Sequence, residues 1–163
     1  MRAVSLNGME FESLASEILG DGHALMFRAR GNSMQPSILE GDVLEVQVVG
    51  SDDIRRGDVL LCALQEDKII AHRVIQTLHV DDQPQFLIKA DARFTPDGIL
   101  PFDQVLGRVV ALQRKGRSID IGSPHYRILF MMRIEMIKLK NRVKSIFIAL
   151  RSKFGALYYS VIG

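Results

Sequence analysis

The most informative stretch of the sequence is residues 30–42, RGNSMQPSILEGD. It follows a strand-like run at residues 24–30 and precedes another at residues 42–49, with turn-forming residues between them. In such a turn the side chain of Ser33 can point outward, beside backbone N–H groups that are free to hold an oxyanion. A serine after Gly-Asn is more often a turn former or a helix cap, so this stretch alone leaves the role of Ser33 open.

Strand-like runs recur along the chain at intervals of roughly ten residues, as in all-β sandwiches and barrels. They cover residues 24–30, 42–49, 57–64, 68–77, 85–89 and 104–114. No segment between Gly41 and Gly116 is long and periodic enough for a crossover helix. We therefore predict a mainly β fold, antiparallel and coiled or barrel-like, in one globular domain with an appendage.

Helical spacing of apolar residues appears only at the two ends of the chain. A short helix follows Asn7, a plausible cap, and stops at Gly20. A long amphipathic helix starts at Ser123-Pro124, where a capping hydroxyl precedes a proline at the first helical position, and we expect a break near Gly155. The predicted segments are an N-terminal helical segment, residues 1–22, a β-rich domain, residues 23–121, and a basic amphipathic helical tail, residues 122–163.

Charge is distributed unevenly along the chain. Residues 1–113 carry 10 Lys and Arg against 17 Asp and Glu, a net charge of −7, whereas residues 114–163 carry 11 against 2, a net charge of +9. Three interpretations of the tail stay open. It is a solvated helix face that happens to be basic, its apolar side packs on the β-rich domain or a second copy of the chain, or it binds an anionic membrane surface or protein partner. We expect no nucleic-acid partner.

Neither a membrane span nor a secretory signal is visible in the sequence. The longest apolar runs are far shorter than the roughly 20 residues that a spanning helix needs. Residues 1–20 contain three glutamates and no apolar stretch of signal-peptide length. We therefore expect a cytoplasmic protein, peripheral at the membrane if the tail binds lipid.

A nucleophilic serine needs a base, and the chain offers one histidine in a strand-like run. Alternation places Ile70, His72 and Val74 on one face of residues 68–77, where a histidine is usually a buried structural residue. Carboxylates that could orient it, Asp91 and Asp97, lie in a polar loop after residues 85–89. The other three histidines lie near turns or at the start of the tail.

The sequence gives little support for a metal site or a disulfide bond. Cys62 is the only cysteine, so it forms neither an internal disulfide nor a multi-thiolate site. No histidine or carboxylate cluster has the spacing of metal ligands. We expect neither a metal nor another cofactor.

Taken together and in order, the motifs resemble the signal peptidase I superfamily of serine peptidases. The resemblance covers roughly residues 25–112. The matching segments are GNSMQP at 31–36, GD at 41–42, GDVL at 57–60, AHRVI at 71–75, KAD at 89–91 with Asp97 six residues further on, and VLGRVV at 105–110.

The resemblance implies a role for each matched residue. Ser33 is the nucleophile, and His72 stands where bacterial leader peptidases and self-cleaving repressors have a lysine base, as in the endoplasmic-reticulum and spore-former branch. Asp91 and Asp97 are the candidates for orienting the imidazole, with Asp97 preferred for direct contact. The backbone N–H of Ser33 is the expected oxyanion donor, with help from Asn32.

Three features depart from the family pattern. Gly31 stands where many relatives have serine, which removes a side-chain donor from the oxyanion hole. Ala90 replaces a frequent glycine but keeps the following carboxylate. Members that process exported proteins usually carry an N-terminal membrane span, for which we find no counterpart here, so the tail would take over anchoring or the substrate would be soluble.

The predicted function is that of a serine endopeptidase that cleaves a precursor or leader peptide, bound as an extended strand, with small residues near the cut. A repressor-type regulator that cleaves itself is disfavoured, because residues 1–22 are too short for a helix-turn-helix domain and His72 replaces the lysine. The third interpretation is an inactive peptidase fold that serves as a binding module through its basic helix.

Overall fold

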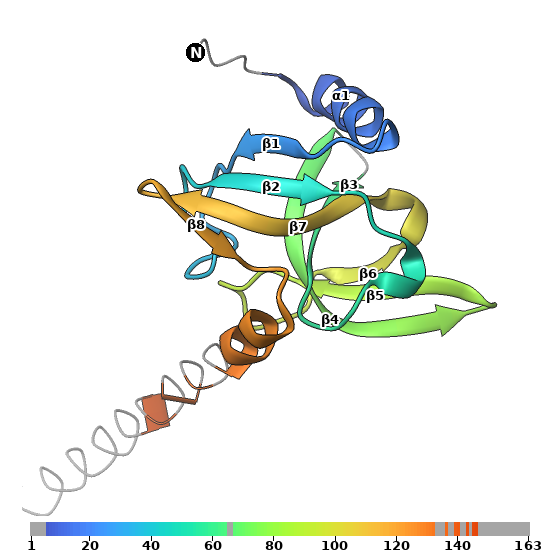
Figure 1. Ribbon diagram of the computed structural model, residues 1–163. Coiled ribbons are helices and arrows are strands. Elements are labelled where there is room, and N and C mark those ends of the chain that lie inside the picture. The colour runs from blue at the N-terminus through green and yellow to red at the C-terminus, as the bar shows by residue number, and fades with distance from the viewer. Residues whose placement is uncertain are drawn as a thin grey trace, which may run out of the picture. The chain divides into compact units, whose positions relative to one another are not determined.

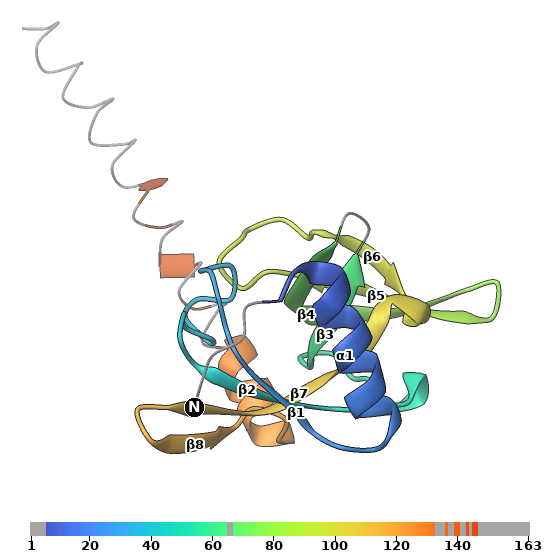
Figure 2. The same ribbon diagram turned by 90° about the horizontal axis from the view of Figure 1, so that it is seen from above.

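A computed structural model describes residues 6–64, 67–132, 136, 139–140, 143 and 145–146. The chain forms two compact units, Met1–Ile128 and Leu129–Gly163. In the first unit, eight strands form one sheet in which every neighbouring pair is antiparallel (Figures 1 and 2). The strands are β1 (Leu25–Arg28), β2 (Val43–Gln47), β3 (Val59–Leu64), β4 (Lys68–Val80), β5 (Gln83–Lys89), β6 (Gly98–Pro101), β7 (Val105–Arg114) and β8 (Arg117–Asp120).

The order of the strands confirms the predicted mainly β fold and refines its shape. The hydrogen-bonded path runs β1-β2-β7-β3-β4-β5-β6, and β8 pairs with β7 beside this path. Because β1 and β6 are the two ends of the path, the sheet is curled but does not close into a barrel. Short 3-10 turns at Ser51–Asp53 and Phe102–Gln104 complete the connections.

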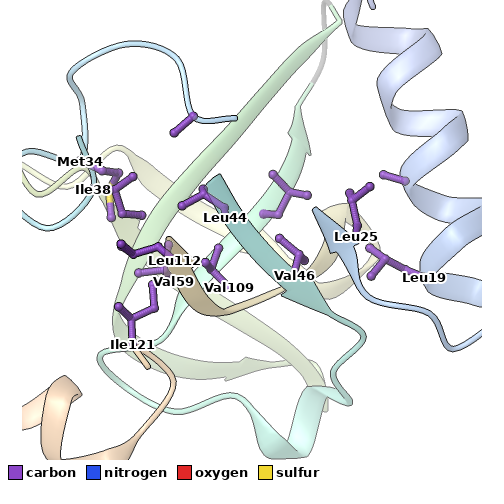
Figure 3. Close-up of a cluster of buried hydrophobic side chains, with 13 residues drawn as sticks. Leu19, Leu25, Met34, Ile38, Leu44, Val46, Val59, Val109, Leu112 and Ile121 are labelled. Carbon is purple, nitrogen blue, oxygen red and sulfur yellow. The ribbon is translucent and has the colours of Figure 1, made fainter. Parts of the chain in front are cut away.

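Side-chain alternation along the strands builds the core. In β2, Leu44 and Val46 are buried between more exposed neighbours and join a cluster with residues of α1, β1, β7 and the Ser33 turn (Figure 3). A second cluster includes Leu60, Val74 and Phe86. Full burial of each such aliphatic side chain stabilises the fold by about 1.5–3 kcal/mol.

The N-terminal helix α1 (Gly8–Gly20) has the cap expected from the sequence. The Asn7 side chain accepts from the Glu10 N–H at 2.9 Å, and the Glu10 carboxylate accepts from the Asn7 N–H at 3.0 Å. The helix buries Ala15 and Leu19 against the sheet. Its Phe11 ring packs edge-on against Phe27 of β1, with centroids 5.1 Å apart.

The sequence analysis missed the β4–β5 hairpin turn and strand β6. β4 and β5 extend to a two-residue turn in which Asp81 and Asp82 both adopt positive φ, a conformation that Asp tolerates better than most residues. β6 begins and ends with the turn-forming residues Gly98 and Pro101, and it is a strand because it pairs with β5. The local composition of β6 therefore does not predict a strand, and the strand forms because of its pairing with β5.

The tail helix begins where the sequence predicts. Residues 124–132 are helical, and the Ser123 hydroxyl accepts from the Tyr126 N–H at 3.3 Å. The predicted break near Gly155 and the apolar positions from Leu150 onward lie outside the described residues. Within the described part of the chain, no helix is both long enough and apolar enough to cross a bilayer.

Candidate active site

The turn that carries Ser33 is anchored on both sides of this residue. Met34 and Ile38 are buried in the core beneath the turn. The buried Ser37 hydroxyl donates to the Met34 carbonyl at 2.7 Å. Ser33 itself is exposed, so the packing of its neighbours holds its side chain at the surface.

Of the polar groups of Ser33, the carbonyl is hydrogen-bonded within the described part of the chain, and the hydroxyl and the backbone N–H are not. Its carbonyl accepts from the Ala92 N–H at 2.9 Å. Among the residues that the structure describes, neither its hydroxyl nor its backbone N–H has a hydrogen-bond partner. Next to it, the Asn32 side-chain oxygen accepts from Gln35 Nε2 at 2.7 Å, which leaves the Asn32 amide N–H groups as donors. Two kinds of donor for an oxyanion are therefore available beside an unengaged hydroxyl.

His72 lies in β4 opposite Leu60 of β3, and its side chain is 7% exposed. Its Nδ1 lies 3.0 Å from Asp97 Oδ2. Nδ1 is therefore close to the carboxylate, although it makes no hydrogen bond within the described residues. Burial lowers the pKa of His72 below 6.5, although the Asp97 charge acts in the opposite direction. The imidazole is therefore neutral at neutral pH, which is the state a general base requires.

Three interactions hold Asp97 beside this ring. Its carboxylate accepts from the Ala90 N–H at 2.6 Å and from Arg93 Nη1 at 2.6 Å. Its own N–H donates to the Ile88 carbonyl at 2.9 Å. The residue as a whole is exposed through its backbone, but its side chain is only 13% exposed. The carboxylate thus has a defined position next to His72.

Asp91, the other predicted carboxylate, makes a different set of contacts. Arg73 Nε and Nη2 donate to its two oxygens at 2.9 and 2.7 Å, and the Ser37 hydroxyl also donates to it. The side chains of the ion pair are 3% and 1% exposed. Because Arg73 follows His72 on β4, Asp91 connects the Ser33 turn to the strand that carries the histidine. Within the described part of the chain, Asp91 makes no hydrogen bond or ion pair with the ring itself, although its charge raises the pKa of His72.

Arg73 and Ser37 are the site residues that sequence reasoning missed. Arg73 also donates to the Gly57 carbonyl at 2.7 Å, so one guanidinium joins two loops and a strand. The signal was present in the sequence: an arginine in an otherwise apolar strand-like run, AHRVI, needs a buried anion. Its partner could not be named from the sequence, because any of several aspartates would serve.

The loop between β5 and β6 is the common support of the site. It bonds to Ser33 through Ala92 and contacts His72 through Asp97. In this state the Ser33 hydroxyl makes no hydrogen bond to the His72 ring, a contact that in peptidases often tightens only with substrate. No group of three or more His, Cys, Asp or Glu side chains within the described residues is arranged to hold a metal.

The domain is therefore an open, curled antiparallel sheet with an exposed serine in a turn and a buried histidine beside a carboxylate. The family model of Peptidase S24-like proteins matches residues 3–110, and the chain belongs to this family. No curated protein matches the chain. Membership supports a serine peptidase or a self-cleaving regulator of the repressor type.

Proposed function

We propose that this protein is a serine endopeptidase that cuts an extended segment of a precursor or leader peptide, with Ser33 as nucleophile and His72 as base. The observation that carries the proposal is the buried, neutral His72 beside Asp97. Asp97 belongs to the β5–β6 loop, which also bonds to Ser33. The histidine in place of a lysine favours the Ser-His branch of the signal peptidase I superfamily.

In the proposed reaction, His72 removes the proton from the Ser33 hydroxyl as Oγ attacks the carbonyl carbon of the scissile bond. The resulting oxyanion accepts hydrogen bonds from the Ser33 N–H and the Asn32 amide. His72 returns its proton to the leaving nitrogen, the C–N bond breaks, and an acyl-enzyme remains. Water then gives a proton to His72 and attacks the ester carbon, which releases the acid and restores the Ser33 hydroxyl.

The two aspartates have separate roles in this proposal. Asp97 stabilises the imidazolium that forms in each half of the reaction, because its carboxylate lies 3.0 Å from Nδ1. Asp91 is a positioning residue, because it holds Arg73 and Ser37 and does not contact the ring. Asp97 is also the aspartate for which the sequence favoured direct contact with the His72 ring.

The sheet offers an edge on which a substrate strand can pair. β4 residues Lys68–His72 pair with β3 on one side, and pairing with β5 begins only at Arg73. The other edge of Lys68–His72 therefore has no strand partner in the described part of the chain, and it ends at the proposed base. An extended peptide adding there would form main-chain hydrogen bonds and present alternate side chains to Ile69 and Ala71.

The test is covalent labelling with a serine-directed phosphonate, followed by peptide mapping. We expect labelling of Ser33 in the wild type, none in Ser33→Ala, and unchanged labelling in Ser118→Ala, which alters an exposed serine of β8. Incubation with candidate leader peptides should give cleavage that Ser33→Ala abolishes. Equal behaviour of wild type and Ser33→Ala would reject the nucleophile and favour a binding module.

Self-cleavage is the alternative that family membership supports. It predicts that the intact mass of the wild type falls during long incubation at alkaline pH and that Ser33→Ala prevents the loss. Under the endopeptidase proposal the mass stays constant while added peptide is cut. The same two samples therefore separate the two activities.

A further inference from the structure

The described part of the C-terminal helix carries a row of exposed apolar side chains that has no role in the proposed catalysis. Successive members are separated by three or four residues, which places them along one side of a helix. Each is between 57% and 69% exposed. These residues, here called the tail stripe, are Leu129, Met132, Met136, Leu139, Val143 and Ile146.

A continuous apolar row of this kind marks an interaction surface more often than a solvated face. Exposed apolar residues scattered singly over a surface are ordinary, whereas contiguous ones indicate a partner or a membrane. The six members of the tail stripe are distributed over residues 129–146 of the sequence.

The charge of residues 129–146 indicates which kind of partner the tail stripe fits. Between residues 129 and 146 the sequence holds five basic residues and one acidic residue, Glu135. Residues 114–163 as a whole carry 11 Lys and Arg against 2 Asp and Glu. A surface that combines apolar side chains with an excess of positive charge fits an anionic partner that is apolar beneath its charges.

A second copy of the chain fits this surface less well. Alternating spacing by three and four is also that of a coiled-coil seam. Coiled coils rely on opposite charges beside the seam, and two copies of this segment would bring mainly positive charges together. Electrostatic repulsion between copies therefore opposes self-association.

We propose that the segment of residues 129–146 binds the surface of an anionic lipid bilayer. The tail stripe would lie at the acyl boundary, and the lysines and arginines of the segment would lie at the phosphates. The helix would then lie in the plane of the interface. This surface would hold the peptidase domain at a membrane face, where precursor peptides that associate with lipid are concentrated. The membrane binding itself does not depend on the proposed catalytic activity.

Co-sedimentation of the full chain with vesicles tests the proposal. We expect binding to vesicles of phosphatidylglycerol and phosphatidylcholine, and at least about tenfold weaker binding to phosphatidylcholine alone. Raising the salt from about 0.1 M to about 1 M should weaken binding to the anionic vesicles, because the Debye length falls to about 3 Å. Ser33→Ala should bind as the wild type does, which separates this result from failure of the peptidase proposal.

Substitutions on and off the stripe complete the test. Met136→Asp with Leu139→Asp should reduce binding at least about tenfold, and Lys140→Glu, which keeps the apolar side, should reduce it about fivefold. Val48→Asp makes the same chemical change at an apolar residue of the first unit that is 61% exposed, and should have no effect. Equal binding by all variants would overturn the proposal. A dimer in light scattering that the stripe substitutions dissociate would overturn it in favour of self-association.

Discussion

The buried pair of Asp91 and Arg73 gives the sharpest quantitative prediction. Replacing Asp91 with Leu leaves the Arg73 guanidinium, whose side chain is 3% exposed, without its carboxylate partner. Breaking a buried ion pair from one side costs about 3–5 kcal/mol, because the remaining charge is buried without compensation. In a protein of this size the loss lowers Tm by about 6–20 °C.

The matched variant replaces both members of the pair. Arg73→Met with Asp91→Leu removes the two charges together, and such replacements of buried pairs by apolar residues are often close to neutral. Ser37 keeps its bond to the Met34 carbonyl, although the Gly57 carbonyl loses the Arg73 donor. We expect the double variant to lie within about 1.5 kcal/mol of the wild type, the net worth of one hydrogen bond.

The assay is urea denaturation of the wild type, Asp91→Leu, Arg73→Met and the double variant, which together form a double-mutant cycle. Asp103→Ala, at an exposed position, is the surface control. A coupling energy near zero, in which the two single losses add up in the double variant, would refute the view that the two residues act as one buried pair. If the stable double variant also loses phosphonate labelling at Ser33, the pair positions the turn in addition to stabilising the fold.

Four further predictions concern individual side chains. Because burial lowers the pKa of His72, peptide cleavage should be constant above about pH 6.5 and should fall at lower pH, with a midpoint below 6.5. Asp97→Asn should move this midpoint lower still, since the Asp97 charge raises the pKa of His72; an unchanged pH profile would contradict the contact. Asn32→Ala should lower kcat by about 10²-fold with little change in KM, and an effect on KM alone would exclude an oxyanion role. Cys62 is 0% exposed, and burial raises its pKa to about 12, so a thiol reagent at pH 8 should label it only after unfolding; rapid labelling of the native chain would show that β3 opens.

Local sequence signals were sufficient for most of the secondary structure. The Asn7 cap followed by Glu10 marks the start of α1, and Ser123-Pro124 marks the start of the tail helix. The alternation in β2 reflects burial of one side chain in two, which depends only on strand geometry. β6 was missed because a four-residue segment that begins with glycine and ends with proline has little local preference for a strand, and pairing with β5 stabilises it as one.

The candidate site divides in a similar way between sequence and tertiary structure. The order of the motifs along the chain carried the family resemblance, and that resemblance singled out Ser33, His72 and the two aspartates as candidates. Which aspartate contacts the ring could not be decided from spacing, since Asp91 and Asp97 lie in the same loop.

The folded chain assigns Asp97 to His72 and Asp91 to Arg73, and adjacent residues of β4 explain why. Neighbouring side chains of a strand point to opposite faces, so two acids of one loop meet two different partners. Local patterns were therefore enough to predict most of the strands, both helix starts and the kinds of group present. Only the tertiary structure decided which groups meet, because burial and pairing across the sheet depend on residues far apart in the chain.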